Sequence, residues 1–227
     1  MRKEFRFLSI YDKMPQNKNI LEIKKVIPHV GGWLKVKLSK PTIDKLWTYA
    51  KKAKEDYRGN LAGNISKEFK MIDENNWFFD SVLQDLIGAY QKDFSNLGGT
   101  FLTHDHKYIL NQWWINYQKQ NEFNPIHDHS GVYSFVIWMQ IPYDVKEQRD
   151  LPFVKGSNSP RASVFEFTYI DILGHLCHGP YDAAEGYMLF FPSKLKHQVY
   201  PFYKCSKERI SINGNIYLNS DAKLIRE

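Results

Sequence analysis

The sequence predicts a mainly β protein with helices in its N-terminal part. Apolar residues recur at helical spacing before residue 95, whereas short β-branched and aromatic runs separated by turn residues follow Gly99. Such runs are typical of strands in an antiparallel sheet or sandwich. A chain of 227 residues can bury one sizeable core. We therefore expect a single domain over 1–227, with helical support in 1–99 and a β core in 100–220.

Two amphipathic helices are expected in the N-terminal part. Thr42 is a suitable N-cap, and the apolar residues after it keep helical spacing as far as Tyr57, just before the break at Gly59. A second apolar stripe extends from about Asn76 to Phe94. The glycine-containing segment 95–99 that follows it would end this second helix.

Five strands are expected after the glycine-containing segment. They cover 108–117, 132–141, 162–170, 187–191 and 209–218. The stretch 143–160 mixes charges with a Gly-Ser-Asn-Ser-Pro run and predicts a long loop at the sheet edge. Loops in that position often carry substrate contacts.

Composition and charge exclude several classes of protein. With 43% hydrophobic and 25% charged residues the chain is typical of a globular rather than a disordered protein. It has neither an apolar run of roughly 20 residues nor a secretory signal, so we expect no membrane span and a cytoplasmic location. Two cysteines are too few for a disulfide framework. The net charge of +6 is spread along the chain, so nucleic-acid binding is not indicated.

Three histidines have the spacing of a metal site. His127 and His129 stand at i and i+2, so on a regular strand both imidazoles point to the same face. His197 follows an apolar strand and can supply a distant third ligand. On a regular strand Asp128 would face away, but it could replace His129 as a ligand if the backbone turned out of the strand near Pro125.

A carboxylate-binding pair follows the third histidine. Arg209 and Ser211 share one face of the last expected strand. The planar guanidinium matches a carboxylate in a bidentate arrangement, and the serine adds a hydroxyl donor. This pair could hold the distal carboxylate of a dicarboxylic acid. Asn116 is a further pocket candidate, because an inward-facing amide among apolar neighbours needs a partner.

Taken together, these motifs resemble a known family. The segments W-I-N at 114–116, N-P-I-H-D-H at 124–129, G-Y-M-L-F-F-P-S at 186–193, His197 and R-I-S at 209–211 resemble, in order, those of 2-oxoglutarate- and Fe(II)-dependent oxygenases of marine bacteria and tailed phages. The resemblance covers roughly residues 108–217. The upstream segment 60–65, N-L-A-G-N-I, also looks like an element found before the core in some members.

The resemblance implies a fold, cofactors and a site. The fold is a double-stranded β-helix, a cupin-like jelly-roll flanked by helices. His127, His129 and His197 become ligands of Fe(II), while Arg209 and Ser211 hold 2-oxoglutarate. The implied co-substrates are 2-oxoglutarate and O2, with a hydroxylase activity on an unidentified main substrate, in a host cytoplasm if the gene is phage-encoded. The better-known relatives carry Asp or Glu where this chain has His129.

Two other functions remain open at this stage. One is a non-catalytic jelly-roll module that binds a metal or another ligand, and the other is a three-histidine metal dioxygenase that does not use 2-oxoglutarate. The Arg209-Ile210-Ser211 segment argues against both, because neither needs a carboxylate clamp. Aromatic residues near the motif could form pocket walls, although aromatics on alternating strands are more often core. The candidates are Trp113, Trp114, Tyr117, Tyr133 and Trp138.

Overall fold

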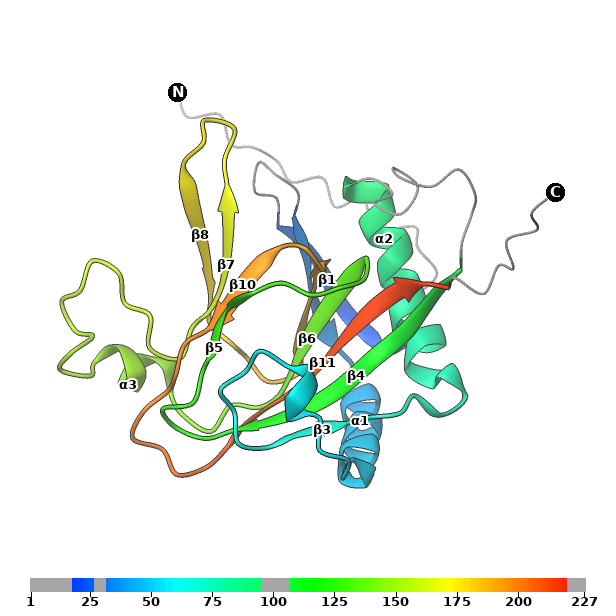
Figure 1. Ribbon diagram of the computed structural model, residues 1–227, viewed down its shortest axis with the longest axis horizontal. Helices are drawn as coiled ribbons and strands as arrows, with labels where there is room; N and C mark the ends of the chain where they lie inside the picture. The colour runs from blue at the N-terminus through cyan, green and yellow to red at the C-terminus, as the bar shows by residue number, and fades with distance from the viewer. Residues whose placement is uncertain (1–17, 27–31, 95–106, 220–227) are drawn as a thin grey trace.

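Two antiparallel sheets form the protein in this computed structural model, which describes residues 18–26, 32–94 and 107–219 (Figure 1). The large sheet has the strand order β1-β2-β9-β6-β11-β4-β3, and the small sheet has the order β5-β10-β7-β8. The strands are β1 (Ile20–Val26), β2 (Trp33–Leu38), β3 (Glu68–Lys70), β4 (Tyr108–Gln118), β5 (Asn124–His127), β6 (Tyr133–Gln140), β7 (Phe165–Ile170), β8 (Leu176–Tyr181), β9 (Tyr187–Pro192), β10 (Lys196–Val199) and β11 (Arg209–Leu218).

Strands β4 to β11 have the topology of a jelly-roll. Along the chain they pass back and forth between the sheets, so that β4-β11-β6-β9 in the large sheet corresponds, in that order, to β5-β10-β7-β8 in the small one. This is the double-stranded β-helix arrangement, and it confirms the expected fold class. All five predicted strands are present, although 162–170 begins only at Phe165. The short strands β5, β8 and β10 were not predicted.

The N-terminal part supplies strands as well as helices. Strands β1 and β2 extend the large sheet beyond β9, and β3 extends it beyond β4. Helices α1 (Lys40–Lys52) and α2 (Gln84–Phe94) lie against this sheet, α2 following a π-helical turn at Phe79–Leu83 (Figure 1). The expectation of purely helical support before residue 100 was therefore incomplete.

The predicted bounds of the first helix were wrong at both ends. Ser39, not Thr42, is the N-cap, and its hydroxyl accepts the Thr42 N–H at 3.4 Å. Pro41 occupies the first turn, where its missing N–H costs nothing. The helix ends at Lys52 because the chain then becomes extended, and the Tyr57 N–H donates to the Glu68 carbonyl oxygen of β3 instead of continuing the helix.

Successive side chains of β4 point to opposite faces of the large sheet and so belong to two different cores. Trp113 and Ile115 pack with the helices on one face of the large sheet, whereas Trp114 and Asn116 line a pocket between the sheets. Trp138 also lines that pocket, and it packs with Phe165 and Phe191 in the inner core. Of the five aromatic wall candidates, only Trp114 and Trp138 line the pocket, while Trp113, Tyr117 and Tyr133 pack on the helix side.

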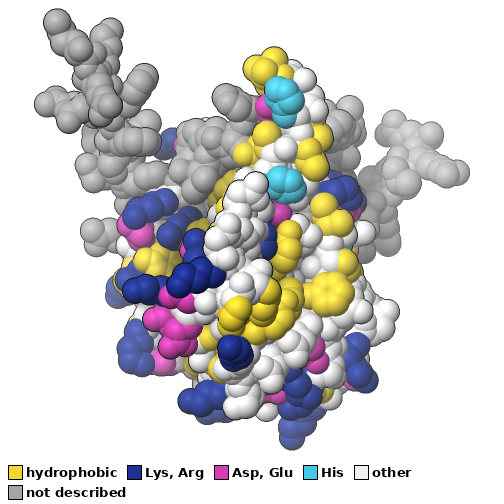
Figure 2. All heavy atoms as spheres, turned by 90° about the vertical axis from the view of Figure 1, so that its left-hand side faces the viewer, with side chains coloured by type: hydrophobic (Ala, Val, Ile, Leu, Met, Phe, Trp, Pro, Cys, Tyr) yellow, Lys and Arg dark blue, Asp and Glu magenta, His cyan; other side chains and the backbone are white. Residues whose placement is uncertain are grey.

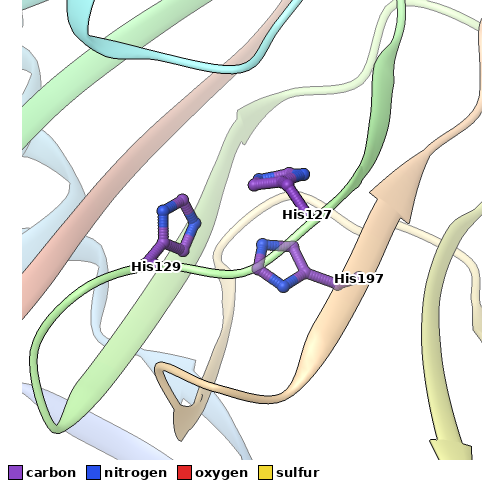
Figure 3. Close-up of side chains that lie close together, drawn as sticks. All are labelled: His127, His129 and His197. Atoms are coloured by element: carbon purple, nitrogen blue, oxygen red, sulfur yellow. The ribbon is translucent and has the colours of Figure 1, made fainter.

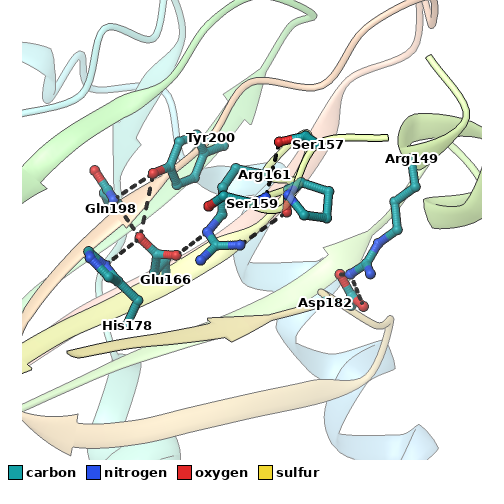
Figure 4. A network of polar contacts seen from close by, with 10 residues as sticks. Arg149, Ser157, Ser159, Arg161, Glu166, His178, Asp182, Gln198 and Tyr200 are labelled. Atoms are coloured by element: carbon teal, nitrogen blue, oxygen red, sulfur yellow. Dashed lines mark hydrogen bonds and ion pairs between the residues drawn. The ribbon is translucent and has the colours of Figure 1, made fainter. Parts of the chain in front are cut away.

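The expected 143–160 loop is bound to the small sheet rather than free. It contains the short helix α3 (Val145–Arg149), whose Asp144 N-cap accepts the Lys146 N–H. Arg149 pairs with Asp182 at 2.7 Å. Figure 4 shows this pair and, nearer the sheet, the network around the buried carboxylate of Glu166.

The carboxylate of Glu166 links side chains from several segments at the small sheet. It pairs with Arg161, accepts from Gln198 Nε2 at 2.8 Å and contacts His178 Nδ1 at 3.1 Å. His178 lies on β8. Arg161 thereby fixes the segment that leads into β7.

Surface charge agrees with the expectation from sequence. On the face shown in Figure 2, Lys and Arg side chains are interspersed with Asp and Glu.

None of the helices in the described ranges is long and apolar enough to cross a membrane. The predicted glycine break at 95–99 and the second His-Asp-His string at 104–106 lie outside the described residues.

Candidate metal centre and cofactor pocket

Three elements bring the predicted histidines together. His127 is the last residue of β5 and pairs directly with His197 of β10 across the small sheet. His129 lies two residues beyond the end of β5, in the connection to β6. Figure 3 shows the three rings facing one another from these positions.

The rings are close enough to share one ion. The possible ligand atoms of His127, His129 and His197 all lie within 4.8 Å of one another. Ring centroids are 4.3 Å apart for His127 and His197, 4.9 Å for His127 and His129, and 5.0 Å for His129 and His197. Imidazole is a good ligand for iron and other first-row divalent metals, so the donor set fits Fe(II).

Backbone carbonyls orient two of the rings. His127 Nδ1 donates to the Pro125 carbonyl oxygen at 2.7 Å, and His197 Nδ1 donates to that of Leu195 at 2.9 Å. A carbonyl oxygen can only accept, so Nδ1 carries the proton and Nε2 keeps its lone pair. Such an outer hydrogen bond is the usual way in which a protein orients a metal-binding histidine.

Burial keeps the three imidazoles neutral. The pKa of His127 is lowered mainly by desolvation. The pKa of His129 is lowered to about 3, mainly by desolvation and to a smaller extent by the charge of His127. The pKa of His197 lies well below its ordinary value for the same first reason. Neutral imidazole is the form that binds a metal ion, so the cluster is ready to do so at neutral pH.

Asp128 lies outside the cluster. Its carboxylate contacts Lys196 at 2.7 Å and Lys194 at 3.4 Å, and the Lys196 hydrogen bond is the main cause that lowers its pKa. The chain leaves β5 after His127, so His127 and His129 do not share one regular strand as predicted. His129 nevertheless points inward and Asp128 outward, as that prediction required.

A buried hydrogen-bond chain fixes the backbone of His129. The His129 N–H donates to the Ser193 carbonyl oxygen at 2.9 Å, and the Ser193 N–H donates to that of Val132 at 3.0 Å. The Ser193 hydroxyl bonds Ser134 at 2.9 Å, and Ser134 donates to Asn215 Oδ1 at 2.7 Å. All three side chains are at most 2% exposed. The motif residues Ser134, Ser193 and Asn215 therefore position the connection that carries His129.

A pocket between the sheets joins the histidines to Arg209. It is lined by all three histidines together with Ile65, Trp114, Asn116, Gln118, Asn124, Phe135, Val136, Trp138, Phe165, Phe191, Val199, Arg209, Ser211 and Asn213. The predicted residues Arg209, Ser211 and Asn116 thus meet the histidines in one pocket. Arg209 contacts the carbonyl oxygen of Tyr200, three residues after His197. At strand spacing, three residues correspond to roughly 10 Å.

Arg209 is a buried cation whose partners are all neutral. The guanidinium is 3% exposed. It donates twice to Gln118 Oε1, to the Tyr143 hydroxyl, and to the carbonyl oxygens of Ser163 and Tyr200, at 2.7–3.0 Å. No carboxylate in the described part of the chain pairs with it. Burying an uncompensated charge is costly, so this position favours an anionic ligand and fits a carboxylate of 2-oxoglutarate.

Sequence reasoning missed one ionisable residue beside the pocket. Glu68, on β3, is 1% exposed, and its Oε2 has no hydrogen-bond partner. Burial, and next the charge of Glu122, raise the pKa of Glu68 to about 7, against the smaller opposing effect of Arg58. The segment around Glu68 is short and mixed in charge, so only the nearby 60–65 motif could have drawn attention to it.

Comparison with known proteins identifies the segment that carries this pocket. Residues 112–215 match the model of a family described as "Putative 2OG-Fe(II) oxygenase". This segment is similar to the 2OG-Fe(II) oxygenase family. The match includes His127, His129, His197, Arg209 and Ser211. A 2OG-Fe(II) oxygenase takes Fe(II) and 2-oxoglutarate as cofactors and O2 as co-substrate.

Two solved structures are similar to this chain at low sequence identity. A Pseudomonas putida prolyl-4-hydroxylase is 13% identical, with a TM-score of 0.46, over 84% of this chain and 94% of that one. An oxidoreductase of the 2OG-Fe(II) oxygenase family from Burkholderia pseudomallei is 14% identical, with a TM-score of 0.45, over 81% and 84% of the two chains. No curated protein sequence matches the chain.

Replacing Ser134 by alanine tests the buried chain behind His129. The substitution leaves the Ser193 hydroxyl without its acceptor and Asn215 Oδ1 without its donor. We expect S134A to lower the free energy of unfolding by about 1–3 kcal/mol, measured by urea denaturation. The exposed serine variant S66A is the control and should match the wild type. Equal stability of S134A and S66A would contradict the network.

The raised pKa of Glu68 predicts a pH-dependent stability. A carboxyl group whose folded pKa lies above its unfolded value contributes stability that is complete below about pH 4.5 and is lost as the pH rises through about 7. The difference in unfolding free energy between wild type and E68Q should therefore fall by about 3 kcal/mol over this range. Urea denaturation at several pH values measures it. A difference that is constant with pH contradicts the prediction.

Proposed function

We propose that the protein is an Fe(II)- and 2-oxoglutarate-dependent hydroxylase in which His127, His129 and His197 bind the iron. The observation that carries this proposal is the convergence of three imidazoles, that of His197 buried and the other two half-buried, within 4.8 Å in one pocket with Arg209. Asp128 is held by two lysines and would not be a ligand. With three protein ligands on one side, other coordination positions stay open for co-substrates.

Arg209 and Ser211 would hold the far carboxylate of 2-oxoglutarate. The buried guanidinium lacks an anionic partner, and Ser211 adds a hydroxyl on the same face of β11. Binding would replace one of the neutral acceptors of Arg209. The Tyr143 hydroxyl suits this exchange, because a phenol can donate to a carboxylate as well as accept from Arg209. Asn116, which pairs with Ser211 across β4 and β11, offers an amide N–H to the same ligand.

The chain's own residues would then orient the ligands and exclude water. When bound, Fe(II) and 2-oxoglutarate supply the oxidising chemistry that places an oxygen atom from O2 into a C–H bond. Phe165 stacks on His197 with centroids 5.5 Å apart, and Trp114 meets the edge of His129 at 5.7 Å. These apolar walls hold the rings in place and keep the surroundings of the metal dry, which suppresses side reactions.

Two alternative functions are less consistent with Arg209. One is a non-catalytic jelly-roll that binds only a metal, and the other is a three-histidine dioxygenase that does not use 2-oxoglutarate. Neither function gives a role to the buried cation in the pocket. Burying that charge beside the metal ligands is costly unless an anion binds there. The carboxylate of a co-substrate supplies this anion.

The histidine assignment is tested by anaerobic titration with Fe(II) and 2-oxoglutarate, following the weak visible charge-transfer band of the chelate. H129A and H197A should lose Fe(II) affinity by more than the roughly 10–100-fold expected for loss of an outer hydrogen-bond partner. D128A is the matched control and should keep both the band and the affinity. Loss of the band in D128A with retention in H129A would reverse the assignment.

The carboxylate assignment is tested by titrating 2-oxoglutarate into the Fe(II)-loaded protein. R209Q should weaken 2-oxoglutarate binding by about 30–100-fold, because it removes a charge-assisted contact, while Fe(II) affinity stays unchanged. R209K keeps the charge without the planar fork and should lie between the two. Circular dichroism checks that both variants fold. Wild-type affinity for 2-oxoglutarate in R209Q would contradict this role.

A further inference from the structure

A row of paired residues crosses the large sheet beside the proposed metal site. Glu68 of β3 pairs with Asn116 of β4, Asn116 pairs with Ser211 of β11, and Ser211 pairs with Trp138 of β6. Residues that pair directly across strands project to the same face. Since Asn116, Ser211 and Trp138 line the pocket, Glu68 projects to the pocket side at the end of this row.

Unpartnered oxygen atoms gather at the Glu68 end of the row. Glu68 Oε2, Asn116 Oδ1 and Asn124 Oδ1 are buried and have no hydrogen-bond partner. Glu68 and Asn116 are 1% and 5% exposed, and both asparagines line the pocket. Buried polar atoms are normally paired, so three unpaired acceptors beside one pocket point to a ligand that donates hydrogen bonds.

Gly63 packs closely against two of these side chains. A Cβ atom at this position would lie 2.4 Å from Asn124 Oδ1 and 3.0 Å from Glu68 Oε1. Asn124 and Glu68 therefore approach the same point of the backbone, and Asn124 also lines the pocket. Ile65 of the same segment lines the pocket too. This gives the 60–65 motif a structural role, because only glycine allows both oxygen atoms to come so close to the backbone.

We propose that Glu68, Asn116 and Asn124 form a subsite that binds a protonated amine or guanidinium group of the main substrate. The pocket then has a cationic end at Arg209 for the carboxylate of 2-oxoglutarate and an acceptor-lined end at Glu68 for a cationic substrate group. No cationic side chain within the described residues forms an ion pair with Glu68. The inference rests on the proposed function for the role of the subsite, but not for its existence.

A cationic group matches the subsite better than a neutral donor. A buried carboxylate is stabilised most by a full opposite charge, and hydrogen bonds between charged partners are about twice as strong as neutral ones. Arg58, the cation that acts on Glu68 from a distance, is itself paired with Asp56. The charge of Glu68 is thus left for a ligand.

The test uses three probes of equal chain length. Saturation-transfer NMR on the full chain without added metal would measure binding of n-butylammonium, n-butanol and butyrate. We expect n-butylammonium to bind most tightly, and E68Q to weaken it by about tenfold or more. The exposed variant E55Q, which removes the same charge from an ion pair with Lys70, should bind like the wild type. Equal binding of the three probes, or unchanged n-butylammonium binding in E68Q, would overturn the proposal.

A second variant covers the case in which E68Q fails to fold. G63A places a methyl group against Asn124 Oδ1 and Glu68 Oε1 and must displace both side chains, so it should weaken n-butylammonium binding while Fe(II) affinity stays at the wild-type value. Retained n-butylammonium binding in G63A would also overturn the proposal. Because the probe measurements use no metal, failure of Fe(II) to bind would count against the proposed function alone.

Discussion

The antiparallel pairing of β5 with β10 places His127 directly opposite His197, and the other parts of the site are arranged around this pair. Two short strands would bind each other weakly if isolated. They are held because β10 also pairs with β7, and because the rings of Phe165 and Phe167 of β7 pack against His197. His129 is held in a different way, by the backbone of Ser193. The Ser193 carbonyl oxygen accepts from the His129 N–H, and the Ser193 N–H donates to the Val132 carbonyl oxygen on the other side of the connection after β5.

The polar interior gives the pocket its chemical character. A jelly-roll normally fills the space between its sheets with apolar side chains, as Trp138, Phe165 and Phe191 do here. This chain instead buries a guanidinium without an anion and a carboxylate without a cation on that side of the large sheet. Each arrangement costs stability, and substrates of matching charge would compensate for that cost when they bind.

The fold class could be predicted from the sequence, and so could most of the residues that the structure brings together in the proposed site. Among the jelly-roll strands of the large sheet, β6 was visible because it is long and apolar, and β11 because isoleucines alternate with polar residues along it. His197, Arg209 and Ser211 were recoverable because each follows or begins such a strand. The strands β5 and β10 were missed because four residues give too little pattern, and β1 and β2 because lysines interrupt theirs.

Other features depend on contacts between distant residues. Nothing local shows that Glu68 is buried, since it becomes so only when β3 pairs with Asn116. The outward direction of Asp128 likewise depends on its contacts with Lys194 and Lys196, which lie more than 60 residues later in the chain. The position of Ser39 as helix cap could have been predicted, because Pro41 marks the first turn.

X-ray absorption spectroscopy of the Fe(II)-loaded protein would show directly whether three histidines bind the iron. We expect the multiple-scattering pattern of three imidazole ligands in the wild type, and of two in H129A, with D128A indistinguishable from the wild type. A wild-type spectrum with only two imidazoles, or one in which D128A loses an oxygen ligand, would contradict the three-histidine site.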